Sequence, residues 1–217
     1  MEIINYIETC NPVYGCSIGC PYCYAARLNT RFKITPDFKV PTIMPQALKK
    51  IHSRSPKTFF MTSMSDLSGW PEDWREEVFN EMRKYPRNSY LFLTKRPDFI
   101  TIDIRDIPGA WIGVTVTGKQ DLWRILKMKQ NLKAQNYCIC FEPLHNSVGK
   151  VNLSGIGYIV IGAETGNRVG KIIPKKEWIT EISESAKGIP VWMKDSLLGI
   201  VGEESFIQEL PKSMKHA

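Results

Sequence analysis

Short apolar runs recur along this chain and are separated by stretches with helical periodicity. The runs are apolar at consecutive positions rather than at every second one, which is typical of strands buried on both faces of a parallel sheet. Polar or turn-forming residues follow each run and mark its end. The predicted strands cover 58–62, 89–94, 110–116, 137–141, 157–161 and 189–193.

The stretches between these runs place apolar residues three and four positions apart, the spacing of a helix that covers a sheet. Prolines mark several of their starts, since proline fits the first turn of a helix. The predicted helices cover 24–28, 45–52, 71–85, 119–133 and 203–210, with one more that begins at Pro174 and includes Trp178, Ile179 and Ile182.

Alternation of buried strands and amphipathic helices predicts an α/β fold with a parallel sheet. Doubly wound and barrel arrangements both fit this pattern. Six or seven strands in 217 residues are fewer than the eight of a complete barrel, which takes about 250 residues. We expect one domain over 1–217, with its core at about 10–196 and a C-terminal helix and tail over 197–217.

Composition is that of an ordinary globular protein, with 43% hydrophobic and 24% charged residues. No apolar run has the length needed to span a bilayer, and the N-terminus lacks the basic segment and apolar core of a signal peptide. We therefore expect a cytoplasmic protein whose cysteines stay reduced. The net charge of +7 is spread in short basic runs, so charge alone does not establish nucleic-acid binding.

Three of the six cysteines lie within eight residues, at the spacing C-x3-C-x2-C. They are Cys16, Cys20 and Cys23. Gly15, Gly19 and Pro21 interrupt the segment, which favours a tight loop over a helix or strand. Thiolates bind zinc, copper(I) and iron–sulfur clusters, and a zinc site usually completes its tetrahedron with a fourth Cys or His.

No second cysteine pair follows this loop, and His52, His145 and His216 form no spaced set. Three thiolates without a fourth ligand favour an iron–sulfur cluster with one open iron. A partial zinc knuckle and inert thiols are the alternatives. Cys10 carries no mark of a ligand, and we expect Cys138 and Cys140 to be core residues because buried cysteines are common in strands.

Polar residues follow almost every predicted strand, at the sheet edge where parallel α/β folds gather their functional groups. A short strand over 11–15 would bring the cysteine loop to the same edge. Helix capping is the alternative role, above all for Ser65 and Asp66. Glu142, Glu164 and Lys194 are the strongest functional candidates. The full set of candidates is Ser63, Ser65, Asp66, Lys95, Thr115, Thr117, Glu142, Glu164 and Lys194.

The cysteine spacing, with Tyr22 before the third cysteine, resembles the signature of radical S-adenosylmethionine (radical SAM) enzymes. Further segments resemble a phage- and mobile-element-associated radical SAM family of unassigned function, and together they cover about residues 10–196. They are Asn11-Pro12, Met64-Ser65-Asp66-Leu67, Leu93-Thr94-Lys95-Arg96-Pro97, Gly113-Val114-Thr115-Val116, Phe141-Glu142-Pro143-Leu144 and Gly162-Ala163-Glu164-Thr165-Gly166.

The resemblance implies a partial (β/α)6 TIM-like barrel and a [4Fe–4S] cluster on Cys16, Cys20 and Cys23. It implies that S-adenosylmethionine (SAM) binds the open iron and is reductively cleaved to a 5′-deoxyadenosyl radical, which abstracts hydrogen from a substrate. A single-electron donor of flavodoxin or ferredoxin type would be the partner. The basic charge and small size of the chain favour a nucleotide or nucleic acid as the substrate, with a peptide or small metabolite as the alternative.

The resemblance also suggests cofactor contacts. Tyr22 would lie beside the adenine, Thr115 or Thr117 beside the ribose, and Lys95 or Lys194 beside the SAM carboxylate. Glu142 or Glu164 would face the ribose or the substrate. Ser63, Ser65 and Asp66 stand where the superfamily has a Gly-Gly-Glu-like segment that holds the methionine amine, which is a departure from its pattern.

Two other classes of function compete with this reading. One is a non-catalytic, metal-stabilised nucleic-acid-binding module, which a fourth ligand near the loop or basic residues among exposed aromatics would favour. The other is an electron-transfer iron–sulfur protein, which would need four protein ligands for a complete cluster. The sequence shows none of these features.

Overall fold

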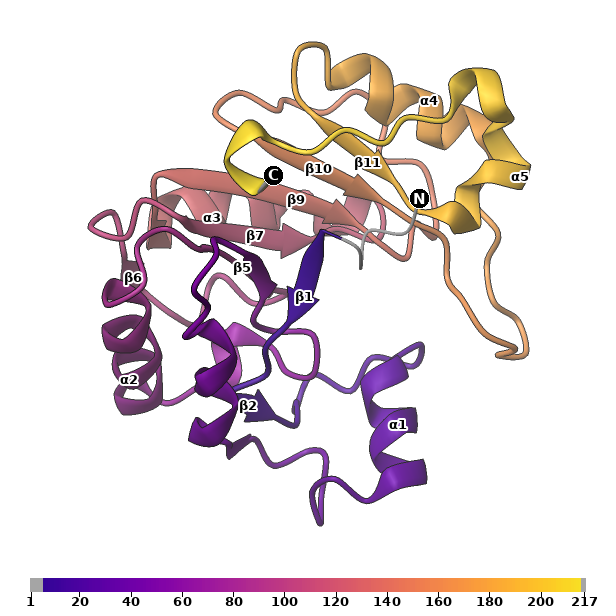
Figure 1. The fold of residues 1–217 in the computed structure, drawn as a ribbon. Helices are drawn as coiled ribbons and strands as arrows, with labels where there is room; N and C mark the ends of the chain where they lie inside the picture. Colours follow the sequence, from indigo (N-terminus) through magenta and orange to yellow (C-terminus); the bar gives the residue numbers. More distant parts are fainter. Residues whose placement is uncertain (1–5, 216–217) are drawn as a thin grey trace.

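The protein contains a curved sheet of seven parallel strands, seen in the computed structural model, which describes residues 6–215 (Figure 1). The N-terminal residues 1–5 and the tail residues 216–217, including His216, lie outside the described part. The strands follow the spatial order β1-β4-β5-β7-β9-β10-β11 and curl into a half-barrel. Their bounds are β1 Ile7–Thr9, β4 Thr58–Phe60, β5 Ser89–Thr94, β7 Ala110–Thr115, β9 Asn136–Phe141, β10 Tyr158–Ile161 and β11 Val191–Met193.

The six strands predicted from apolar runs are all present, and the α/β partial-barrel class is confirmed. The sequence pattern missed the first strand, β1, which is only three residues long and buries only Ile7. No barrel strand forms over 11–15. Instead, β2 (Val13–Tyr14) pairs antiparallel with β3 (Thr42–Ile43) in a small separate sheet. The cysteine loop follows β1 and β2, at the carboxyl edge of the main sheet.

Helices cover the convex side of the sheet and flank its carboxyl edge (Figure 1). The predicted 45–52 segment is a 3-10 helix, Pro45–Ile51, rather than an α-helix. The predicted 119–133 helix ends earlier, because Leu132–Lys133 (β8) pairs in parallel with Ile102–Asp103 (β6). The α-helices are α1 Tyr24–Phe32, α2 Glu72–Arg83, α3 Trp123–Asn131, α4 Lys176–Ser185 and α5 Leu198–Val201.

The predicted helix over 203–210 is wrong. Only Glu203–Ser205 form a short 3-10 turn, after which the chain is extended. The reason is pairing with the sheet edge: the Met193 N–H donates to the Ile207 carbonyl at 2.8 Å, and the Glu209 N–H donates to the Val191 carbonyl at 2.7 Å. These bonds to β11 replace the bonds that a helix would have made within itself.

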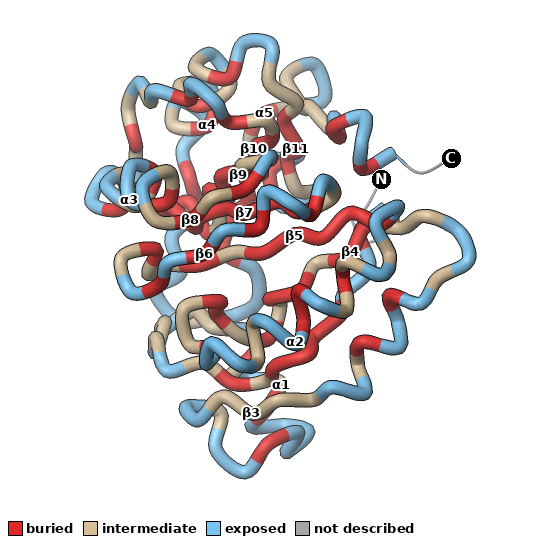
Figure 2. Tube along the Cα trace, turned by 90° about the vertical axis from the view of Figure 1, so that its left-hand side faces the viewer, coloured by how far each residue is buried: buried red, intermediate tan, exposed pale blue. Residues whose placement is uncertain are grey.

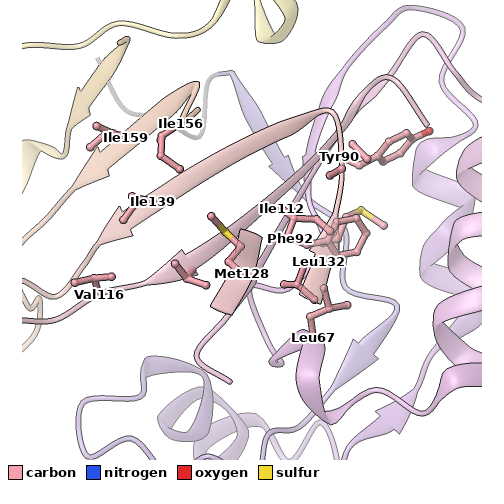
Figure 3. Close-up of a cluster of buried hydrophobic side chains, with 14 of the residues drawn as sticks. Leu67, Tyr90, Phe92, Ile112, Val116, Met128, Leu132, Ile139, Ile156 and Ile159 are labelled. Carbon is pink, nitrogen blue, oxygen red and sulfur yellow. The ribbon is translucent and has the colours of Figure 1, made fainter. Parts of the chain in front are cut away.

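The larger part of the core lies between the convex face of the sheet and the helices. Figure 2 shows the strands buried, while the helices turn exposed positions outward. In the close-up of Figure 3, Phe92 of β5 and Ile112 of β7 lie near Met128 of α3, and Tyr90 lies farther along β5. All four are fully buried, so this side of the sheet is a packed, dry core.

A second, smaller cluster occupies the concave face. Since successive strand residues point to opposite faces, every second strand residue enters it. This inner cluster consists of Ile7, Leu91, Trp111, Cys138, Cys140, Tyr158, Val160, Trp192, Leu210 and Met214, with Phe60 and Leu93 packed against it. The two predicted core cysteines, Cys138 and Cys140, are indeed buried, but on the concave side.

The C-terminal segment closes the amino-terminal end of the half-barrel. The Ser89 hydroxyl donates to the Ser213 carbonyl at 2.8 Å, and the Thr58 hydroxyl donates to the Met214 carbonyl at 3.4 Å. The Met214 side chain, 1% exposed, packs into the inner cluster. Among the described helices, none has the length and apolar character needed to traverse a bilayer.

We expect Met214→Ala to destabilise the protein by about 2–5 kcal/mol, because it removes a fully buried side chain and leaves a cavity. Leu126→Ala is the matched control, since Leu126 is exposed, and it should change stability by less than about 0.5 kcal/mol. Urea denaturation followed by circular dichroism measures both. Equal effects of the two substitutions would show that the C-terminal segment does not seal the barrel.

Candidate functional site

A large cavity opens at the carboxyl edge of the sheet, between α1 and the ends of the strands. Its volume is about 920 Å³. All three cysteines of the loop line it, as do nine of the ten side chains proposed to contact a cofactor. These nine are Tyr22, Ser63, Ser65, Asp66, Lys95, Thr115, Glu142, Glu164 and Lys194.

Thr117 is the exception. Its hydroxyl donates to the Asp121 carboxylate at 2.8 Å, and its backbone N–H donates to the same oxygen at 2.9 Å. Thr117 thus organises the turn before α3 and does not line the cavity. Thr115, the last residue of β7, stands two positions earlier and does line the cavity. Of the two threonines proposed for the ribose, the geometry therefore leaves Thr115.

The cysteine loop is held between β4's end and the segment 36–41. The Gly15 N–H donates to the Met64 carbonyl at 3.1 Å, and the Cys16 N–H donates to the Phe38 carbonyl at 2.7 Å. Gly15 has a φ of +102°, and a Cβ there would lie 2.7 Å from the Val40 carbonyl oxygen. Only glycine fits this position without strain, so the chain enters the first cysteine by a fixed path.

The three thiols are half-buried at the cavity wall. Burial raises the pKa of the Cys16 thiol to about 11, while the nearby Lys95 opposes this effect. The Cys23 sulfur caps α1 by accepting from the Ala26 N–H at 3.4 Å. This contact fixes the position of the Cys23 sulfur at the start of the helix, where it lines the cavity.

The metal-binding donors of the loop are three cysteine thiols that line the cavity. Within residues 6–215, no three Cys, His, Asp or Glu side chains are arranged to hold one metal ion. No histidine is among the described residues that line the cavity. In an iron–sulfur cluster each thiolate binds a different iron, so the thiolates stand farther apart than around zinc. Three thiols on one cavity wall fit such a cluster chemically.

Tyr22 anchors the loop to the strand ends. Its ring contacts His145 edge-on at 5.0 Å between centroids, and the Lys95 ammonium lies 5.9 Å from the ring centre. Burial, followed by the neighbouring Cys20, raises the pKa of the Tyr22 phenol. The phenol therefore stays neutral, and its ring forms part of the cavity wall next to the cysteines.

Asp66 is committed to the protein itself. Its carboxylate accepts from the Thr94 hydroxyl at 2.6 Å, the Lys95 N–H at 2.8 Å and the Ser68 N–H at 3.0 Å. Donors on both oxygens fix the carboxylate as a link between two strand ends. The capping role considered for Asp66 from the sequence is the one that these contacts describe.

The two serines nearby are also engaged. The Ser63 hydroxyl donates to the Asn11 side chain at 2.8 Å, and the Ser63 carbonyl accepts from the Tyr24 hydroxyl at 2.6 Å. The Ser65 hydroxyl accepts from Trp70 Nε1 at 3.0 Å. A hydroxyl that accepts one bond still has its own proton to donate, so Ser65 is available to a ligand in the cavity.

Glu142 and Lys194 form an ion pair across the strand ends, with the Lys194 ammonium 2.8 Å from the Glu142 carboxylate. Burial by itself lowers the pKa of Lys194, but the Glu142 carboxylate and Cys140 outweigh it, so the pKa is raised. Lys194 is thus a cation at neutral pH. The Cys140 sulfur lies 3.8 Å from the other partner, Glu142.

Glu164 is held by two basic side chains. Arg168 donates to both carboxylate oxygens, at 2.5 and 2.8 Å, and His145 Nε2 lies 3.2 Å away. The hydrogen bond from Arg168 is the main cause of a lowered Glu164 pKa. The ion pair fastens the segment after β10 over the cavity, where a Cβ on Gly166 would lie 3.4 Å from the Arg27 guanidinium.

The prediction from strand ends missed the inner wall of the cavity. Cys140 and Trp192 line it, and each stands two residues before a predicted site residue, Glu142 and Lys194. Counting back by two from a strand-end residue follows the same face of the strand. The sequence alone shows that these residues share a strand face with Glu142 and Lys194. Only the curled sheet shows that this face borders the cavity.

Residues 2–199 match a protein family described as a protein of unknown function, DUF5131. The chain belongs to this family. No curated protein matches the chain.

Three solved structures of spore photoproduct lyase are similar in part. A cysteine-to-alanine variant with a dinucleoside spore photoproduct has a TM-score of 0.44 at 12% identity, and another complex with that dinucleoside has 0.45 at 13%. A cysteine-to-serine variant has 0.46 at 14%. The matches cover 82–83% of this chain but only 60–61% of the lyase chains. Likeness at this level carries no information about chemistry.

We expect Arg168→Met to release the segment 165–171, because the Glu164 carboxylate loses both of its bonds to Arg168. Amide hydrogen exchange in this segment should become several-fold faster, while exchange in β7 stays unchanged. Lys176→Met is the control, since Lys176 pairs at 3.7 Å with the exposed Glu204. Unchanged exchange after Arg168→Met would contradict this role of the ion pair.

The same contact predicts a pH dependence. A carboxylate with a lowered pKa stabilises the fold above its ordinary pKa and loses this effect as pH falls through the lowered value. The Tm difference between wild type and Glu164→Gln should therefore be present at about pH 6 and shrink toward about pH 3. A difference that grows on acidification would contradict the assignment.

Proposed function

We propose that this protein is a radical SAM enzyme of the phage- and mobile-element-associated kind. In this proposal Cys16, Cys20 and Cys23 bind a [4Fe–4S] cluster, and SAM binds beside it at the mouth of the cavity. The observation that supports it most is the shared cavity. Three half-buried thiols, Tyr22 of the same loop and eight polar side chains from the ends of several strands line one space of about 920 Å³.

Side chains at the mouth suit the polar groups of SAM. Lys194 and Lys95 supply cations for its carboxylate. The Ser65 hydroxyl can donate to a carboxylate oxygen, and the backbone carbonyls beside it can accept from the amine. Thr115 remains for the ribose, and the Tyr22 ring borders the position proposed for the adenine. Each of these residues lines the cavity.

When bound, the cluster would supply one electron to cleave SAM, and the resulting 5′-deoxyadenosyl radical would abstract hydrogen from the substrate. The protein's own contribution is positioning and exclusion of water. The inner wall beyond Glu142 and Lys194 is mainly apolar, with Leu91, Leu93 and Val160 facing the cavity. Such a wall shields a reactive species from solvent.

We further propose a nucleotide or nucleic acid as the substrate, with an electron donor of flavodoxin or ferredoxin type as the partner. Arg27, Lys33 and Lys39 line the α1 side of the mouth, near only one acidic side chain of that segment, Asp37. Cations at this edge would attract phosphate. A cytoplasmic location, which would keep the thiols reduced, belongs to the same proposal.

Anaerobic reconstitution with iron and sulfide tests the cluster. We expect about four irons per chain and the broad visible absorption of an iron–sulfur cluster, and Cys20→Ala should abolish both. Cys10→Ala is the matched control, because Cys10 is fully buried, donates to the Ala47 carbonyl at 3.3 Å and does not line the cavity. One equivalent of zinc, unchanged by Cys20→Ala, would refute the proposal and favour a different metal protein.

Release of 5′-deoxyadenosine and methionine from SAM by the reduced protein tests the reaction class. We expect Lys194→Met to slow this release about tenfold or more, because it removes the cation proposed for the SAM carboxylate and leaves Glu142 without its ion-pair partner. Lys187→Met, at an exposed position outside the cavity, should have no effect. If reconstituted protein releases neither product with any nucleotide or DNA added, the proposed reaction is wrong.

A further inference from the structure

Two segments beside the cavity mouth carry most of the excess positive charge of the chain. The first, residues 24–41, comprises α1 and the stretch that leads to β3, and the second, residues 162–175, is the loop between β10 and α4. We call them the two arms. Four basic residues and Asp37 give the first arm a net charge of +3, and three basic residues and Glu164 give the second +2. The arms therefore hold +5 of the chain's +7 in 32 of its 217 residues.

The fold brings the two arms together, although they are far apart in the sequence. In Figure 1 the loop after β10 extends toward α1. A Cβ on Gly166 would lie 3.4 Å from the Arg27 guanidinium, and the Lys171 ammonium donates to the Gly166 carbonyl at 2.9 Å. Both arms also line the cavity, the first with Arg27 and Lys33 and the second with Thr165. A cation from each arm thus stands beside the same glycine at the cavity mouth.

Carboxylates leave most of these cations unneutralised. Glu164 is already paired with Arg168, and Arg27 and Arg31 stand four positions apart on one face of α1, where like charges destabilise a helix. Such a concentration of exposed positive charge favours binding of a polyanion. Within residues 6–215, six exposed basic residues of the arms form no ion pair: Arg27, Arg31, Lys33, Lys39, Lys171 and Lys175.

Exposed apolar side chains are interspersed with these cations. Phe32 is 59% exposed between Arg31 and Lys33, and the Arg31 guanidinium lies 5.0 Å from its ring centre. On the second arm, Val169 and Ile173 are also exposed. Cations combined with an exposed aromatic ring are the means by which proteins bind single-stranded nucleic acid, because the cations hold phosphates and the ring stacks on a base.

The layout of the arms favours a nucleic-acid strand over other anionic partners. A membrane-binding surface gathers its apolar residues on one face, whereas here they alternate with cations along both arms. An acidic peptide offers no row of flat rings to stack on Phe32. The cations extend over both arms, farther than a single phosphate group reaches. The arms also flank a cavity, which a base can enter only from a single strand or after it leaves a duplex.

We infer that the two arms bind a single strand of nucleic acid across the cavity mouth, with its phosphates on the exposed cations of both arms and a base stacked on Phe32. The substrate is then one residue of a polymer rather than a free nucleotide. That the strand is the substrate rests on the proposed function; its binding does not. The ion pair between Glu164 and Arg168 supports such binding, because it holds the second arm in place before the strand arrives.

Fluorescence anisotropy of a labelled twelve-nucleotide oligothymidylate measures the binding, with the full chain carrying its oxidised reconstituted cluster and with no SAM present. One variant neutralises the first arm, Arg27→Gln with Arg31→Gln, and another neutralises the second, Lys171→Gln with Lys175→Gln. We expect each variant to weaken binding about twentyfold in about 0.1 M salt. The slope of log affinity against log salt should fall by about 1.4, because each phosphate contact to a single strand contributes about 0.7.

Lys119→Gln with Lys127→Gln is the matched control for both arm variants. It makes the same change in net charge, and both lysines are exposed, lie outside the arms and do not line the cavity. Because salt screens charges that lie far from the strand, this control should weaken binding by less than about twofold. Thermal melting followed by circular dichroism shows that all three variants are folded.

A strand of the same length without bases tests the stacking. We expect the wild type to bind this abasic strand about fivefold or more weakly than oligothymidylate, and Phe32→Ala to remove most of the difference. Phe99→Ala is the matched control, since Phe99 is also exposed, has the Arg96 guanidinium 3.3 Å from its ring centre and does not line the cavity. It should keep the preference of the wild type for bases.

Other ligands can overturn the assignment to a single strand. Thymidine monophosphate should compete at least about a hundredfold more weakly than the oligomer, because it offers one phosphate to many cations. Equal competition would show that the site takes a free nucleotide. Tighter binding to vesicles of equal parts phosphatidylcholine and phosphatidylserine, lost in Val169→Ser, would assign the arms to a membrane. Binding of a duplex that is as tight as that of the strand and unaffected by Phe32→Ala would exclude a single-strand site.

The outcomes also separate strand binding from the proposed function. If the arm variants weaken binding no more than the Lys119 and Lys127 control does, the arms are not the binding site, even in a protein that cleaves SAM. If both arms and Phe32 are needed for strand binding in a protein that never cleaves SAM, the two-arm site is supported and the radical SAM proposal fails.

Discussion

The constraint on which the rest of this structure depends is the two-residue repeat of its parallel strands. In a curled sheet this repeat sends alternate side chains to the packed convex side and to the concave side. The convex series, with Phe92 and Ile112, makes a dry core with the helices. The concave series cannot close on itself in a half-barrel, so it borders a cavity. Polar residues that follow a strand in the concave series, such as Glu142 and Lys194, are thereby directed to the mouth of one space.

Ion pairs hold the charged side chains in place at the mouth of this space. At the mouth, Glu142 pairs with Lys194 and Glu164 pairs with Arg168. The first pair joins the ends of two strands, β9 and β11, and the second holds the segment that follows β10. The edge of the cavity is therefore fixed before any ligand binds. Inside, the walls are apolar, and the C-terminal segment seals the far end with Leu210 and Met214. The polar mouth and the apolar interior thus have separate causes, ion pairing at one end and burial at the other.

Sequence patterns identified most of the fold because most strands are runs of several consecutive apolar residues. Six strands are apolar runs in which nearly every residue is buried, as in β7 and β10, and their short length between turn-forming residues favours strands over buried helices. β1 escaped prediction because Ile7-Glu8-Thr9 is short and partly exposed. The helix expected over 203–210 failed for another reason. Its periodicity was genuine, but backbone bonds to β11 at Val191 and Met193 outweighed local preference. Local patterns cannot report a bond to a residue that is far away in the sequence or on another element.

The sequence by itself determined the order of strands and helices, the three-thiol loop at its glycine-marked turn, and the strand ends at which polar residues stand. The tertiary structure alone decided which of these residues meet and which remain open to a ligand. It committed Asp66 to Thr94 and Lys95 and turned Thr117 away toward Asp121. The physical reason is that the spacing of apolar residues shows which side of a helix or strand is buried. Which side chains pair, and which are buried, depends on the elements that the curl of the sheet packs together.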